Sequence, residues 1–127
     1  MTIAHSTSTR NAMADLVVDR IDAGSGAGKI KFYTAGFGAL MTSIDFSDPA
    51  FGSASGGSAT MTPGSITGTI SLAGTNVMAK FRIEDSDANE VLTGDVGLTG
   101  ADINLTNTTF NQNDTVTINS LTYTASP

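Results

Sequence analysis

The chain has 127 residues, which suits one domain with a single hydrophobic core. Hydrophobic residues make up 39% and charged residues only 14%, and Gly, Ser, Thr, Ala and Asn fill much of the rest, which favours a β-rich protein with many turns over a helix bundle. The absence of cysteine excludes a disulfide framework and a cysteine-ligated zinc site, and the net charge of −6 argues against a nucleic-acid partner.

The first part of the chain predicts an arm followed by one helix. Residues 1–9 are rich in Ser and Thr and offer little to a core, so we expect an arm that is mobile in the free protein. Residues 10–127 then form a single β-rich domain that begins with a helix over residues 10–22. Ser8 or Thr9 can cap its first turn, and Gly24 can end it. The expected apolar stripe is Ala12, Met13, Leu16, Val17 and Ile21, with Asp15, Asp19 and Arg20 in water.

After Gly28 the sequence predicts roughly eight short strands separated by turns, which is typical of an antiparallel β-sandwich or barrel. The fold class is therefore mainly β with one N-terminal helix. The clearest strand covers residues 76–84, where side chains alternate between core and solvent. Its inward side chains are expected to be Val77, Ala79, Phe81 and Ile83, and its outward ones Asn76, Met78, Lys80, Arg82 and Glu84.

Three further strands have assignable faces. Two inward sets alternate in the same way, and they are Leu40, Ile44 and Phe46 in one strand and Ile66, Ile70 and Leu72 in another. In the last strand the apolar residues change phase between Ile118 and Leu121. A bulge at residues 119–120 would bring Val116, Ile118, Leu121 and Tyr123 to the core together.

The stretch EDSDANEVLTGD, residues 84–95, has two possible interpretations. Asp85, Asp87 and Asn89 alternate as in the first half of a calcium-binding loop. Such a loop needs glycine at its sixth position and glutamate at its twelfth, where this chain has Glu90 and Val96. Alternating strands flank the stretch, so we favour the tip of a β-hairpin without structural calcium.

Two other candidates for chemistry are weaker than their structural alternatives. AGSGAGKI, residues 23–30, lacks the first glycine and the hydroxyl residue of a phosphate-binding loop, so it is expected to link the helix to the first strand. His5, the only histidine, lies in the arm with nothing near it in sequence to orient it as a catalytic base. We therefore assign no catalytic, cofactor-binding or metal residue and expect no cofactor and no enzyme activity.

Charge and hydropathy give two expectations about the surroundings of the protein. The N-terminus has no signal-peptide pattern, and no apolar run reaches the length of a membrane span, so we expect a cytosolic start and no membrane contact. From Ile83 onward there are seven acidic residues and no basic one. The simplest interpretation of this acidic half is a solvated surface that keeps the protein soluble.

Three stretches of the chain resemble a family of small structural proteins of tailed bacteriophages and prophages. They are STRNAMADLVVDRIDAGSGAGKIKFYT, IDFSDPAFG and FRIEDSDANEVLTGDVGLTGADINL. The family shows an RNAMAD…DAG.GAGK start, a FSDPAFG middle and a FR..DSDG..VL.GDVG..GAD..L end. This chain departs from that pattern in its hairpin, where Ala88 and Asn89 follow Asp87 in place of an Asp-Gly turn, and in its short AGFGA loop.

The resemblance implies a component of the virion, assembled in the bacterial cytoplasm, without enzyme activity. The first expectation is a capsid decoration (cement) protein that binds the phage major capsid protein on the outer shell and stabilises the head. Self-association, for which a trimer suits the local three-fold points of a shell, would strengthen weak single contacts through avidity. A tail, baseplate or fibre component is the alternative. A small enzyme or sugar-binding domain carried on the virion is a third possibility, although the chain has no Trp and only two Tyr for sugar stacking.

Overall fold

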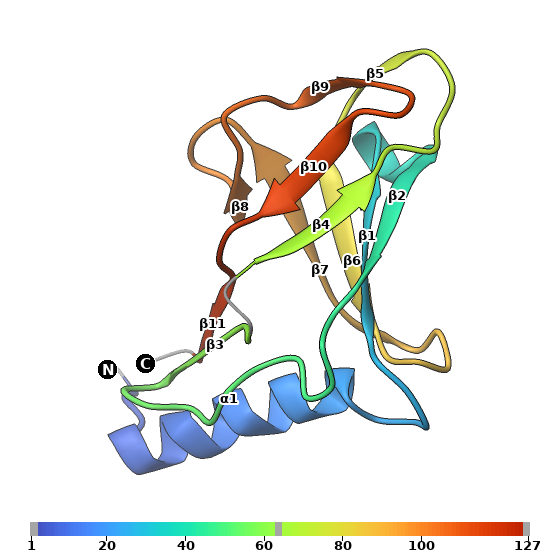
Figure 1. Cartoon of the computed structure of the whole chain (residues 1–127). Helices are drawn as coiled ribbons and strands as arrows, with labels where there is room; N and C mark the ends of the chain where they lie inside the picture. Colours follow the sequence, from blue (N-terminus) through green and yellow to red (C-terminus); the bar gives the residue numbers. More distant parts are fainter. Residues whose placement is uncertain (1–2, 63–64, 126–127) are drawn as a thin grey trace.

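The structure, a computed structural model, describes residues 3–62 and 65–125 and is mainly β with one helix near the N-terminus (Figure 1). This confirms the predicted fold class. The helix and the strands of the first half are α1 (Thr7–Ile21), β1 (Lys29–Tyr33), β2 (Leu40–Asp45), β3 (Ser58–Thr60) and β4 (Ile66–Thr69). The later strands are β5 (Thr75–Val77), β6 (Lys80–Glu84), β7 (Glu90–Gly97), β8 (Ile103–Asn104), β9 (Thr109–Asn111), β10 (Thr115–Ile118) and β11 (Thr122–Thr124).

The strands form a curled sheet and three ribbons. The sheet has the order β2-β1-β6-β7-β8, and all its pairs are antiparallel except β7–β8, which is parallel and corrects the expectation of a wholly antiparallel fold. The β4–β10 ribbon lies across this sheet, with β5–β9 at one end and with β3–β11 and α1 at the other (Figure 1). No helix in the described part of the chain is long and apolar enough to cross a membrane.

The curl closes where β4 meets β2. The Thr42 hydroxyl donates a hydrogen bond to the Thr69 carbonyl oxygen at 2.9 Å, and the Ser71 N–H donates to the Met41 carbonyl oxygen at 2.9 Å. A Cβ atom on Gly68 would lie only 2.5 Å from Cγ1 of Ile44, so this crossing depends on a residue without a side chain. The order around the barrel is therefore β8, β7, β6, β1, β2, β4 and β10.

One hydrophobic core lies between the sheet, the β4–β10 ribbon and the helix. The predicted inward positions Phe81 and Ile83 of β6 are buried, as expected, but Glu84, which was predicted to face water, is buried as well because it pairs with Lys31 and Arg82. Beside Phe81 and Ile83 in the core lie Val18, Ile21, Ile30, Phe32, Ile44, Phe46, Ile66, Ile70, Val116 and Ile118.

Helix α1 begins earlier than predicted and buries a different face. Its N-cap is Ser6, whose hydroxyl oxygen accepts a hydrogen bond from the Thr9 N–H at 3.2 Å, so residues 7–9 are helical and do not belong to an arm. The buried side chains are Ala14, Val18 and Ile21. The predicted stripe was therefore wrong except at Ile21, and Leu16 is 66% exposed.

Polar side chains explain this rotation of the helix. The Oδ1 atoms of Asn11, Asp15 and Asp22 accept hydrogen bonds from the main-chain N–H groups of Gly57, Ala54 and Ala50 at 2.7, 2.7 and 2.9 Å. These three residues follow one another at spacings of four and seven, so they share a face of the helix. Asp15 was predicted to face water, but it faces the loop before β3. Burial raises the pKa of the Asp22 carboxyl, and the Ala50 N–H partly offsets that effect.

Three local features of the strands also differ from the predictions. Phe32 pairs with Thr42 and Tyr33 with Leu40, so Met41 is an extra residue in β2, and this bulge places Leu40 on the outside and Met41 in the core. Residues 76–84 form two strands, β5 and β6, with a break at which Met78 is buried while Val77 is 56% exposed. The proposed bulge near residue 119 is instead a break after which β11 pairs with β3.

Candidate interaction surface

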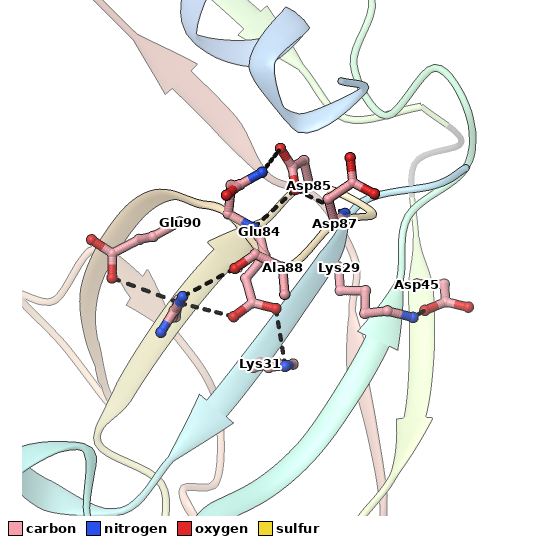
Figure 2. Close-up of polar contacts among 10 residues, drawn as sticks. Lys29, Lys31, Asp45, Glu84, Asp85, Asp87, Ala88 and Glu90 are labelled. Carbon is pink, nitrogen blue, oxygen red and sulfur yellow. Dashed lines mark hydrogen bonds and ion pairs between the residues drawn. The ribbon is translucent and has the colours of Figure 1, made fainter. Parts of the chain in front are cut away.

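The stretch around Asp85 forms the tip of the β6–β7 hairpin, as predicted (Figure 2). The Asp85 carboxylate accepts hydrogen bonds from the main-chain N–H groups of Asp87 and Asn89, both at 2.9 Å, and from the Asn89 side-chain amide at 3.1 Å. The Asn89 N–H contributes most to holding the pKa of Asp85 below its usual value. This carboxylate therefore organises the turn, and no cluster of three or more metal-ligating side chains occurs among the described residues.

The hairpin tip also fixes the linker between α1 and β1. The Ser86 hydroxyl donates to the Ala23 carbonyl oxygen at 3.3 Å and accepts from the Gly26 N–H at 3.2 Å. The AGSGAGKI stretch is thus a helix-to-strand connection, as expected. His5 is exposed and lies one residue before the N-cap of α1.

The outer face of the sheet, which we define by Lys29, Lys31, Lys80, Arg82 and the acids that pair with them, is charged but balanced. The buried carboxylate of Glu84 lies 2.9 Å from both the Lys31 ammonium and Nε of Arg82 (Figure 2). Lys29 pairs with Asp45, Lys80 with Asp95, and Arg82 also approaches Glu90 at 3.6 Å. Four of the six basic residues of the chain are used in this way, so this face has little net charge to attract a charged partner.

A groove opens on the opposite side of the barrel from the β2–β4 crossing. We call it the open groove, and it has a volume of about 740 Å³. Its lining includes residues of β8, the last strand of the curled sheet, and of β10, one strand of the β4–β10 ribbon. Figure 1 shows where these two strands lie. The lining of the open groove is formed by residues 102–107, Phe110 and residues 115–122.

Main-chain groups on both walls of the open groove point into it. Leu105 N–H donates to Gly97 O at 2.9 Å, so the neighbouring Asn104 turns its own N–H and C=O away from β7. Ile70 N–H donates to Asp114 O at 2.8 Å, and the antiparallel alternation then directs the main-chain groups of Thr115 and Thr117 away from β4. Within residues 3–62 and 65–125 no strand pairs with either edge.

An apolar cavity of about 300 Å³ lies next to the open groove. The two share Asp102, Leu121 and Thr122 in their linings. We call this space the inner cavity; its walls come from both the helix and the sheet, chiefly Val18, Ile21, Phe51, Phe81, Ile83 and Leu92. Asp102 is the one charged residue in the lining of either space.

The open groove was not predicted from the sequence. Charged residues and proline usually protect an exposed strand edge, and residues 103–113 and 115–124 contain neither. This composition was the one sequence feature that could have indicated unpaired edges. Comparison of the chain with protein-family models, curated proteins and solved structures gave no significant match.

Proposed function

We propose that this chain is a structural protein of a bacteriophage virion that decorates the outer surface of the head. The sequence resemblance supports this proposal, and the three resembling stretches also meet in space. The first contacts the second through Asp22 and Ala50, and it contacts the third through Ser86, which bonds Ala23 and Gly26. The shared residues therefore hold one structural unit together, as expected of a family defined by its scaffold.

The open groove is the observation that carries the proposal. A decoration protein must hold neighbouring shell subunits, and free strand edges offer main-chain hydrogen bonds to such a neighbour. A groove of this size makes a small contact, so a single copy would bind weakly. Assembly into a homo-oligomer, with a trimer matching the local three-fold points of a shell, would multiply that contact through avidity on the major capsid protein.

The copy number in purified particles tests this function. Quantitative mass spectrometry of intact particles, with the major capsid protein as the internal standard, should give copies that scale with the shell subunits. Isolated tails from the same preparation serve as the control and should lack the protein. A few copies per particle, or co-purification with tails, would contradict head decoration and favour a tail, baseplate or fibre component.

A further inference from the structure

We propose that the open groove binds an extended segment of another polypeptide as an added β-strand, which closes the barrel between β8 and β10. The segment would alternate apolar and polar residues, carry at least one Lys or Arg, and place a bulky apolar side chain in the inner cavity. The proposal rests on the proposed function only in taking the partner to be another protein.

The main chain of the open groove is arranged for strand addition. On one side the N–H and C=O groups of Asn104 face the opening, and on the other side those of Thr115 and Thr117 do so. Such groups are the ones that recognise an added strand independently of its sequence. A strand between them would join the curled sheet to the β4–β10 ribbon and complete the ring that β2 and β4 already close on the far side.

The inner cavity supplies the side-chain specificity. In an added strand, alternate side chains point inward, where Val116, Ile118 and Leu121 form an apolar floor. The inner cavity of about 300 Å³ adjoins this floor at Leu121 and is lined by core residues such as Ile21, Phe81 and Leu92. One inward side chain of the partner, such as Phe or Leu, can fill this space and act as an anchor.

Charge favours a basic segment over an acidic one. Asp102 lines the open groove beside β8, and Asp114 precedes the groove-lining Thr115 of β10. Their hydrogen bonds come from the main-chain N–H groups of Asp95 and Asn111, and the ion pairs of the described residues do not include them. A basic side chain in the open groove would therefore meet the carboxylate of Asp102, which belongs to the groove lining and to no ion pair of the described residues.

The same charges disfavour a second copy of this chain as the occupant. Pairing of two open grooves would bring Asp102 of one copy toward Asp102 of the other, in molecules that each carry a net charge of −6. Like charges across an interface oppose association. A basic strand of a different protein avoids this repulsion.

A peptide-binding experiment tests the proposal on the full-length protein. The probe is the synthetic peptide GKIKFYT, residues 28–34 of this chain, because its Ile and Phe alternate with two Lys. Fluorescence anisotropy should show saturable binding with one peptide per protein. The peptide with Lys29→Glu and Lys31→Glu should bind about fivefold more weakly or worse, and the peptide with Phe32→Ala should lose most of its affinity. Equal binding of all three would overturn the proposal.

Matched variants separate strand addition from adhesion elsewhere on the surface. Thr117→Pro removes an N–H that faces the open groove and should abolish binding, whereas Thr117→Ala keeps that N–H and should bind like the parent protein. Should Thr117→Pro fail to fold, an N-methyl group on Lys31 of the peptide removes a strand hydrogen bond with the parent protein intact, and it should also abolish binding. Unchanged binding of the N-methylated peptide would overturn strand addition.

Sedimentation of the free protein identifies the competing occupant. Self-association with rising concentration that Thr117→Pro abolishes would assign the open groove to a second copy and overturn the proposal. A sedimentation coefficient that does not change with protein concentration, together with binding of the basic peptide, supports the proposal. The peptide experiment uses the free protein and no virus particles. A low copy number on heads would therefore contradict the decoration role without changing the outcome of the peptide experiment.

Discussion

Asp85 is the residue on which the β6–β7 turn depends. Its carboxylate accepts hydrogen bonds from two main-chain N–H groups and one side-chain amide, and these donors stabilise the ionised form. The folded pKa of Asp85 lies below its usual value of 3.8. A carboxylate of this kind contributes stability that is present above its unfolded pKa and is lost as the pH falls through the lower, folded pKa.

The substitution Asp85→Asn should therefore change how stability depends on pH. The free energy of urea unfolding should be lower in Asp85→Asn than in the parent at pH 7. The gap should narrow below about pH 4, where Asp85 of the unfolded parent chain takes up a proton before the folded carboxylate, whose pKa is lower, does so. Asp87→Ala is the control, since Asp87 serves this turn through its main-chain N–H, and its effect should be small at both pH values. A gap between the Asp85→Asn and parent curves that stays constant down to pH 2.5 would contradict this role.

Ala88, in the same turn, has an unfavourable backbone conformation. Its φ is +66°, in the left-handed region that glycine adopts without strain and alanine does not. Ala88→Gly should raise the free energy of unfolding by about 0.5–1 kcal/mol. Ala12→Gly, the same substitution at an exposed position of α1, should lower it by about 1 kcal/mol. Destabilisation by Ala88→Gly would mean that the turn does not have this geometry.

At the scale of the element, the orientation of α1 is the feature most open to test. Ile21 is buried and Leu16 is 66% exposed. Ile21→Ala should cost about 2–5 kcal/mol because it leaves a cavity in the core. Leu16→Ala should change stability by less than about 0.5 kcal/mol. Chemical denaturation of both variants checks the prediction, and equal losses would restore the helix face that the apolar pattern indicated.

The same helix shows why part of the fold could not be read from the sequence. Periodicity predicted a helix and its end, but it used the apolar residues alone to choose the buried face. The observed face is set instead by the hydrogen bonds that Asn11, Asp15 and Asp22 accept from residues 50–57, and it leaves Leu16 exposed. In β2 the single inserted residue Met41 reverses the faces, and nothing local in the sequence marks such a bulge. By contrast, the hairpin was predictable because all of its determinants lie within residues 80–97.

At the scale of the whole molecule, the open groove is a product of topology. Its two walls, β8 and β10, belong to different sheets. The crossing of β4 over β2 and the pairing of β9 with β5 help to set the distance between them, and both contacts join residues far apart in the chain. The strands were recognisable from alternation, but which edges remain unpaired is not encoded within any one strand. The candidate binding surface therefore required the assembled structure.

Residue-resolved amide hydrogen exchange of the free protein, at a concentration where it is monomeric, tests most directly the claim that this barrel is open. The N–H groups of Val116 and Ile118 face β4 and should exchange slowly. Those of Asn104, Thr115 and Thr117 face the open groove and should exchange much faster. Protection of Thr115 and Thr117 equal to that of Val116 and Ile118 would show that the edge is already paired and would contradict the account.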